Sequence, residues 1–235
     1  MPRYRKIYES EAATYDALVS REDWQGNLAP ALDRICPLAE KVVVEFGAGT
    51  GRLTRLLARK AKIVHAFDSY PAMLAQAQVN LSRERIGNAH ICIGDNRSIP
   101  MPEASADIAI AGWTFGHFTS WHPETWTQEI GAALGEMARV TRPAGTQIII
   151  ETLGTGSAVP VEPTDRLSQY YALLERKYGF LRTWIRTDYR FRSRQEADSL
   201  TSAFFGKEYS TQVDSDGAVI LPECTGIWVR NSTEK

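Results

Sequence analysis

The feature that most constrains the fold of this chain is a glycine-rich turn between a strand pattern and a helix pattern. Residues 42–44 are three valines, typical of a buried strand, and residues 52–60 have the pattern of a helix. Between them, residues 45–51 read E-F-G-A-G-T-G. A strand, a glycine turn and a helix in this order form a nucleotide-binding corner, because the glycines let a ligand approach the backbone and the helix N-terminus presents free N–H groups.

The spacing of the glycines disfavours one class of ligand. A dinucleotide fingerprint reads G-x-G-x-x-G, or ends in alanine, since the third small residue allows the helix to pack closely. Counted from Gly47, the third position holds Arg52, and counted from Gly49 it holds Thr54. A nicotinamide-dependent oxidoreductase is therefore disfavoured.

The order that is present, E-x-G-x-G-x-G, resembles the first motif of class I S-adenosylmethionine-dependent methyltransferases of the small-molecule type. In that family the acidic residue and the glycine backbone receive the methionine end of the cofactor. The resemblance implies S-adenosyl-L-methionine as the cofactor of this chain. It assigns the cofactor-binding positions of the turn to Glu45, Gly47, Ala48, Gly49 and Gly51.

Acidic residues follow the next two predicted strands. Residues 62–67 read as a strand that ends in Asp68, about twenty residues after the glycine turn, where α/β folds that bind nucleosides place a carboxylate for the ribose hydroxyls. Residues 91–93 form a short strand followed by Gly-Asp-Asn. By the resemblance, Asp95 and Asn96 contact the adenine; the alternative for this pair is a plain turn. The other cofactor-binding residues that we expect are Tyr15, Ser69, Met73, Gly112 and Trp113.

Two further strands complete the resemblance. Residues 106–111 precede Gly112, and residues 146–151 follow a Thr-Arg-Pro-Ala-Gly turn where the family usually has Leu-Lys-Pro-Gly-Gly. These ordered features cover most of residues 41–151. They imply an α/β fold of the Rossmann-like class I methyltransferase type, with a seven-stranded, mostly parallel sheet, an antiparallel C-terminal strand and helices on both faces.

Length and composition agree with a single domain over residues 1–235, since 43% hydrophobic residues suffice for one sizeable core. The chain has no stretch of eighteen apolar residues and its N-terminus lacks an apolar signal core. We therefore expect a cytoplasmic protein with no membrane partner.

The three cysteines are far apart and odd in number, which predicts neither a disulfide framework nor a metal site.

Two segments are expected to cover the ligand. The resemblance implies that residues 1–40 form an N-terminal helical cap over the cofactor, and an aromatic face such as that of Tyr15 suits a sulfonium cation. Residues 152–192 are predicted to be an inserted substrate lid. From residue 166 to residue 194 there are eight Lys or Arg, two acidic residues and seven aromatic residues. The alternative is a solvated face whose aromatic side chains dock on the core.

The end of the chain is expected to complete the sheet. Ser193 and Glu196 have the spacing of a capping box, which predicts a helix that ends at Gly206. The last two strands are predicted at residues 208–213 and 218–229, joined by a hairpin turn. One of them would be the antiparallel strand of the family.

These features predict methyl transfer to a small-molecule acceptor, aromatic or anionic in nature. The reaction is an in-line displacement, so the protein must align acceptor and methyl group within about 3–3.5 Å and exclude water. A hydroxyl or protonated amine acceptor would also need a base, for which His117 is the first candidate, with His122 and Glu151 as further ones. The alternative for both histidines is a structural role in the loop. A carboxylate or thiolate acceptor would need none of them.

Two alternatives from other classes stay open. An RNA or protein methyltransferase is conceivable through the basic lid. However, the chain outside residues 166–194 carries a charge of −7. The end of the fourth strand reads Ala-Gly-Trp-Thr, where base-amino methyltransferases have Asn/Asp-Pro-Pro-aromatic. A nucleic-acid partner is therefore disfavoured. The second alternative is a non-catalytic protein that binds S-adenosylmethionine.

Overall fold

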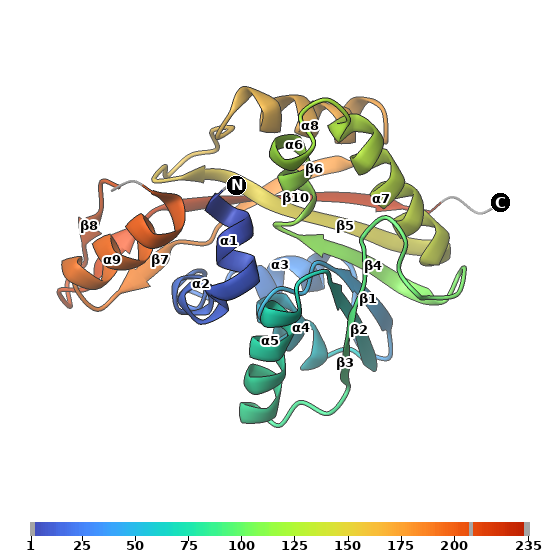
Figure 1. Ribbon diagram of the computed structural model, residues 1–235, viewed down its shortest axis with the longest axis horizontal. Coiled ribbons are helices and arrows are strands. Elements are labelled where there is room, and N and C mark those ends of the chain that lie inside the picture. Colours follow the sequence, from blue (N-terminus) through green and yellow to red (C-terminus); the bar gives the residue numbers. More distant parts are fainter. Residues whose placement is uncertain (1–2, 207–208, 233–235) are drawn as a thin grey trace.

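The centre of the protein is a seven-stranded sheet covered by helices (Figure 1). The computed structural model describes residues 3–206 and 209–232. The strand order is β3-β2-β1-β4-β5-β10-β6, and β10 runs antiparallel to both of its neighbours, whereas the remaining neighbours are parallel. This confirms the predicted fold class. The strands are β1 (Val42–Phe46), β2 (Ile63–Asp68), β3 (Ala89–Ile93), β4 (Ala106–Gly112), β5 (Thr141–Thr155), β6 (Leu181–Arg186) and β10 (Glu223–Asn231).

The two faces of the sheet are buried under different sets of helices. In β4, Ile108 and Ile110 belong to one apolar cluster, and Ala109 and Ala111 belong to the other, because successive side chains of a strand point to opposite faces. The first face is covered by α3 (Leu28–Ile35), α4 (Arg52–Ala58) and α5 (Pro71–Arg83). The second face is covered by α6 (Phe118–Trp121), α7 (Trp126–Val140) and α8 (Asp165–Arg176).

The strand order places a crevice beside β1. β2 and β3 lie on one side of β1, and β4 and the later strands lie on the other side. In open parallel sheets, ligands bind outside the carboxyl ends of the strands at such a reversal. The glycine turn follows β1 and Gly112 ends β4, so both lie at this crevice.

The N-terminal part of the chain lies at the same edge. α1 (Arg3–Ser10) and α2 (Ala12–Val19) contact α5, and α2 also contacts α9 (Arg194–Phe205). In Figure 1, α1 stands beside the carboxyl-terminal edge of the parallel strands. Residues 3–19 are therefore the part of the predicted cap that reaches the crevice, while α3 packs against the sheet.

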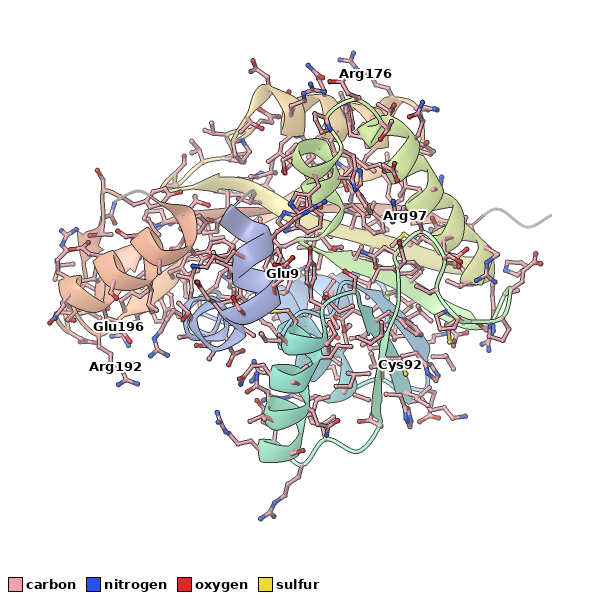
Figure 2. The ribbon with its side chains drawn as sticks, in the orientation of Figure 1. Glu9, Cys92, Arg97, Arg176, Arg192 and Glu196 are labelled. Carbon is pink, nitrogen blue, oxygen red and sulfur yellow. The ribbon has the colours of Figure 1, made fainter. Side chains whose placement is uncertain are left out.

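The prediction of an inserted lid at residues 152–192 is wrong. Residues 152–155 continue β5, residues 165–176 form α8 on the sheet, and residues 181–186 form β6, the edge strand paired with β10. Tyr170 and Tyr171 are fully buried. Five of the seven basic residues of this segment are exposed, and Arg176 points outward in Figure 2. An edge strand and an amphipathic helix can have the same mixture of basic and aromatic residues as a lid. The structure supports the alternative, a solvated face whose aromatic side chains dock on the core.

The inserted segment lies later, between β6 and β10. It contains α9 and a separate small sheet of β7 (Tyr189–Phe191), β9 (Val219–Leu221) and β8 (Gln212–Val213). The predicted helix is confirmed: Ser193 Oγ accepts a hydrogen bond from Glu196 N at 3.1 Å, and Gly206 ends the helix with φ 74°. In the part of the chain that the structure describes, no helix combines the length and apolar character needed to span a bilayer.

The predicted terminal hairpin exists, but in the small sheet. β8 pairs with β9, and Gly217 occupies the turn with φ 79°. The predicted start of the first strand, residue 208, lies outside the described residues. The prediction of one strand over residues 218–229 is wrong, because Pro222 separates β9 from β10 and a proline has no N–H for the ladder.

Candidate functional site

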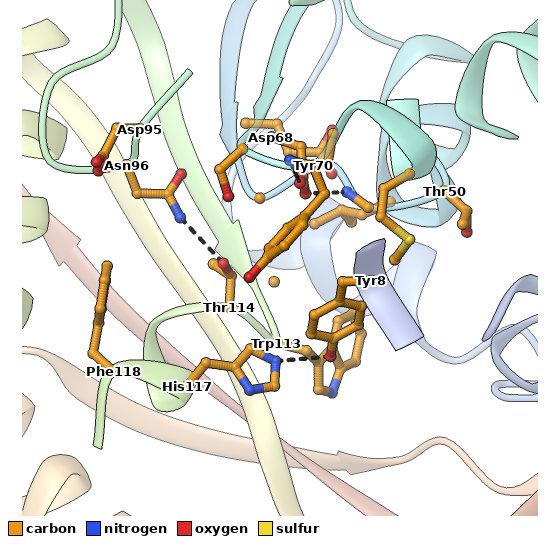
Figure 3. A pocket seen from close by; sticks show the side chains of 18 of the residues that line it. Tyr8, Thr50, Asp68, Tyr70, Asp95, Asn96, Trp113, Thr114, His117 and Phe118 are labelled. Atoms are coloured by element: carbon orange, nitrogen blue, oxygen red, sulfur yellow. Dashed lines mark hydrogen bonds between the residues drawn. The ribbon is translucent and has the colours of Figure 1, made fainter. Parts of the chain in front are cut away.

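A pocket lies in the crevice at the carboxyl ends of β1, β2 and β4 (Figure 3). Its walls come from the glycine turn, from the residues that follow β2, β3 and β4, and from α1 and α2. The structure brings thirteen of the fourteen predicted site residues to this pocket. They are Tyr15, Glu45, Gly47, Ala48, Gly49, Asp68, Ser69, Met73, Asp95, Asn96, Gly112, Trp113 and His117.

The glycine turn closes tightly on its neighbours. Gly47 has φ 76°, and a Cβ at this position would lie 2.6 Å from the Cβ of Thr114. At Gly49, with φ 54°, a Cβ would lie 3.8 Å from the ring of Tyr15, so this glycine leaves room on the pocket side. Gly51 does not line the pocket. It precedes α4 with φ 82°, and a Cβ there would be 3.3 Å from the Cβ of Ala77, so it serves helix packing.

Asp68 connects the end of β2 to the glycine turn. Its Oδ2 accepts a hydrogen bond from Gly49 N at 2.8 Å, and its Oδ1 accepts one from Tyr70 N at 2.9 Å. Burial raises the pKa of this carboxyl, and the two backbone donors oppose that rise. A carboxylate offers about four acceptor positions, so each oxygen retains capacity for a hydroxyl group of a ligand.

Glu45 lies at the base of the pocket and is fully buried. Its Oε2 accepts a hydrogen bond from Thr54 Oγ1 at 2.7 Å, and burial raises the pKa of Glu45 to about 8. The guanidinium of Arg52 lies 3.7 Å from the centre of the Trp113 ring and forms an ion pair with Glu22. This end of the pocket therefore holds a buried acid and a cation that is already paired.

The opposite end is formed by residues that follow β3. Arg97 Nε donates to Asp95 Oδ1 at 2.9 Å, and this partner lowers the pKa of Asp95. Asn96 Nδ2 donates to Thr114 Oγ1 at 3.1 Å, which joins this loop to the loop after β4. Asn96 Oδ1 is buried and has no hydrogen-bond partner among the described residues.

Unsatisfied polar atoms concentrate in the pocket. Of the six buried side-chain atoms that lack a partner in the described part of the chain, four belong to pocket residues. Such an atom costs roughly 1–3 kcal/mol, so a ligand with polar groups would remove a real penalty here. The four atoms are Arg5 Nε, Thr50 Oγ1, Asn96 Oδ1 and Trp121 Nε1.

His117 sits in the short helix η1 (Phe115–His117) and points toward α1 (Figure 3). Its Nε2 lies 3.0 Å from the hydroxyl of Tyr8, and its ring stacks on Trp121 with centroids 4.8 Å apart. Burial lowers the pKa of His117 to about 4. A histidine with so low a pKa is a weak base at neutral pH, so this environment disfavours the predicted role of His117 as general base.

The other candidate bases lie elsewhere. His122 lines the pocket next to Phe118, with ring centroids 5.9 Å apart. Glu151 lies behind the pocket wall, where its Oε1 accepts a hydrogen bond from Gly116 N at 2.9 Å and burial raises its pKa to about 8. Glu151 therefore stabilises the loop after β4 through Gly116. Among the described residues no group of histidine, cysteine and acidic side chains could hold a metal ion.

The sequence analysis assigned no site role to Arg5, Tyr8, Tyr70 or Trp121, all of which line the pocket. Arg5 and Tyr8 are three residues apart in α1, so they share one face of the helix, and this spacing was the available signal. Trp121 is brought to the pocket by packing between α6 and α1, which no local pattern encodes.

Comparison with known protein families gives one match that covers the glycine turn. Residues 43–145 match the family described as methyltransferase domain. This segment runs from β1 through β4 and into β5, and it contains the predicted cofactor-binding residues other than Tyr15.

Individual relatives agree with this match. The malonyl-[acyl-carrier protein] O-methyltransferase of Serratia marcescens is 29% identical over 150 residues, covering 64% of this chain and 52% of that protein. An uncharacterized methyltransferase of Bacillus velezensis is 33% identical over 133 residues, covering 54% of this chain and 61% of that protein. The matched part thus spans about half to three fifths of these relatives.

Among solved structures, an S-adenosylmethionine-dependent methyltransferase from Aquifex aeolicus has the same fold. The TM-score is 0.59 at 16% sequence identity, and the comparison covers 94% of this chain and 97% of that chain. This likeness supports the strand order and helix layers described above.

Proposed function

We propose that this chain, which belongs to the class I S-adenosylmethionine-dependent methyltransferases, binds S-adenosyl-L-methionine in the pocket and transfers its methyl group to a small-molecule acceptor. The observation that carries the proposal is the contact between Asp68 and Gly49, which joins the carboxylate at the end of β2 to the glycine turn after β1. The unsatisfied polar atoms in the same pocket support it.

The residues fit the cofactor in three places. The backbone of the glycine turn, with Glu45 beneath it, would hold the amino and carboxyl groups of the methionine part. Asp68 would accept hydrogen bonds from the ribose hydroxyls. Asn96, whose Oδ1 lacks a partner among the described residues, and Asp95 would contact the adenine. Bound S-adenosylmethionine supplies an electrophilic methyl group on a sulfonium sulfur.

The chain itself contributes alignment and exclusion of water. Tyr15 covers the glycine turn at Gly49 and would present an aromatic face to the cation. Arg5 and Tyr8 line the pocket from α1. Holding acceptor and methyl group in line can lower the barrier of such a displacement by about 7–11 kcal/mol.

A small acceptor is favoured over a polymer by the position of the basic residues. The basic segment at residues 166–194 contributes no residue to the pocket wall among the described residues. The Serratia marcescens relative is named for malonyl-[acyl-carrier protein], which speaks against a nucleic acid but not against an acceptor carried on a protein. The remaining alternative, a non-catalytic protein, would bind the cofactor without methylating any acceptor.

Calorimetry with S-adenosylmethionine and with its demethylated product tests the proposal. Wild type is expected to bind both with micromolar affinity. Asp68→Asn keeps the size of the side chain but removes the negative charge that accepts two backbone hydrogen bonds. Affinity for the cofactor should therefore fall about ten- to hundredfold, corresponding to about 1.4–2.7 kcal/mol. Asp165→Asn, on the exposed start of α8, is the matched control and should bind as wild type does. Absence of binding, or equal affinity in Asp68→Asn, would overturn the proposal.

A further inference from the structure

The pocket has a second half that the cofactor-binding residues do not account for. Its walls are aromatic rings from three distant segments: Tyr8 of α1, Tyr70 after β2, and His117 and Trp121 after β4. The ring centroids of Tyr8 and Tyr70 are 5.7 Å apart, and each lies 6.2 Å from that of Trp121. This arrangement suits a planar, largely apolar group.

A guanidinium lies over one of these rings. The Cζ of Arg5 is 5.4 Å from the centre of the Trp121 ring. Among the described residues Arg5 forms no ion pair, and its Nε is buried without a hydrogen-bond partner. The other two arginines of the pocket wall are paired: Arg52 with Glu22, and Arg97 with Asp95 and Glu129. Arg5 is therefore the pocket cation available to an anion, and a guanidinium matches the two oxygens of a carboxylate.

The residues of the pocket also limit which acceptors could lose a proton there. An acceptor that must lose a proton needs a base, and the acidic side chains of the pocket are engaged: Glu45 by Thr54 and Asp68 by Gly49. Asp95 is engaged by Arg97. His117 faces the hydroxyl of Tyr8, and burial lowers its pKa to about 4. His122 lies toward the end of the pocket that Asp95 lines, where it contributes to lowering the pKa of Asp95. This half of the pocket therefore suits an acceptor that is already deprotonated at neutral pH.

We infer that the acceptor is an aromatic carboxylic acid, held by Arg5 through its carboxylate and methylated on a carboxylate oxygen; this inference rests on the proposed function. The carboxylate oxygen donates an electron pair to the methyl carbon, and the bond between that carbon and sulfur breaks with its pair returning to sulfur. The negative charge of the acceptor and the positive charge of the sulfonium are both neutralised. No proton is transferred, and the product is a methyl ester.

The test uses methyl-labelled S-adenosylmethionine with three probe acids, namely benzoate, phenylacetate and trans-cinnamate, and their primary amides as neutral counterparts. The full-length protein is expected to label at least one acid and no amide. Alkali should then release the label as methanol, because an ester is cleaved and a methyl ether or N-methyl group is not. Label that resists alkali, or equal labelling of acids and amides, would overturn the inference.

Substitution of Arg5 provides the second part of the test. Arg5→Gln should raise KM for the acid at least tenfold with a smaller change in kcat, and Arg5→Lys should restore part of the loss. Lys6→Gln changes the neighbouring cation of the same helix, which points outward with 74% of its side chain exposed, and should leave KM unchanged.

Calorimetry separates failure of this inference from failure of the proposed function. Wild type and Arg5→Gln should bind S-adenosylmethionine with affinities within about threefold, which also shows that the variant folds. If wild type binds the cofactor but labels none of the acids, or if KM is unchanged in Arg5→Gln, the inference is wrong and the proposed function stands. If wild type does not bind the cofactor, the proposed function itself fails.

Discussion

Gly47 is the position at which one added methyl group should damage the pocket most. Its φ of 76° costs an alanine about 1–2 kcal/mol. The new Cβ would also lie 2.6 Å from Thr114 Cβ and 3.0 Å from its Cγ2, besides a closer approach to Oγ1. Relieving such overlap typically costs about 1–3 kcal/mol. Gly47→Ala should therefore lower the free energy of unfolding by about 2–5 kcal/mol, a large part of the 5–15 kcal/mol usual for a domain.

The same substitution should reach the ligand. Thr114 Oγ1 accepts a hydrogen bond from Asn96, so moving Thr114 disturbs the walls after β3 and β4 together. We expect affinity for S-adenosylmethionine to fall at least tenfold in calorimetry. Urea denaturation followed by circular dichroism measures the stability change. The urea concentration at the midpoint should fall while the dependence of the free energy on urea concentration stays the same.

A control glycine should respond with the opposite sign. Gly135 is exposed within α7, and a Cβ there would meet no atom within 4 Å. Gly135→Ala should raise the free energy of unfolding by about 0.5–1 kcal/mol, because alanine favours the helix. If Gly47→Ala loses less than about 0.5 kcal/mol, or binds the cofactor as wild type does, the reasoning about this turn is refuted.

Two other substitutions test strain and buried charge. Ala144 has φ 60°, so Ala144→Gly should stabilise the protein by about 1 kcal/mol, seen as a rise in Tm of roughly 2–4 °C; an unchanged or lower Tm would contradict it. Burial raises the pKa of Glu151 from 4.5 to about 8, so its protonated form contributes stability that is fully present below pH 4.5 and is lost as pH rises toward 8. Glu151→Gln cannot titrate, and its Tm should therefore fall less steeply with pH over this range; parallel curves would exclude the effect.

The sequence predicted those parts of the structure that depend on neighbours in the chain. The glycine turn between β1 and α4 could be recognised because the required backbone angles, the apolar run and the helix start fall within about twenty residues. The capping residues Ser193 and Glu196 were recognisable for the same reason, since their hydrogen bond spans three residues. Spacing between strand ends then located Asp68, because β2 follows β1 directly in the sheet.

The parts that were predicted wrongly depend on which strand pairs with which. β6 is an edge strand, four of whose six residues are exposed, so its sequence has neither the continuous apolar run of a buried strand nor a clear alternation. Its exposed Leu181 and Trp184 resemble the surface of a lid as much as that of a sheet edge. The pairing of β10 with both β5 and β6 is set by contacts over long separations along the chain, and no local pattern reports it.

The two halves of the pocket also differ in whether local sequence or long-range packing positions their residues. The proposed cofactor half consists of residues at strand ends, such as Asp68 and Asn96, whose positions follow from the sheet itself. The proposed acceptor half consists of Arg5 and Tyr8 of α1 and of Trp121 in α6, which approach each other only when these short helices pack together. Substitutions in α1 and α6 can therefore change the charge and shape offered to the acceptor without altering any strand or the bond between Asp68 and Gly49. A sheet of this kind can thus retain one methyl donor while its acceptor changes, and the residues that determine the acceptor should be sought in the helices over the carboxyl edge.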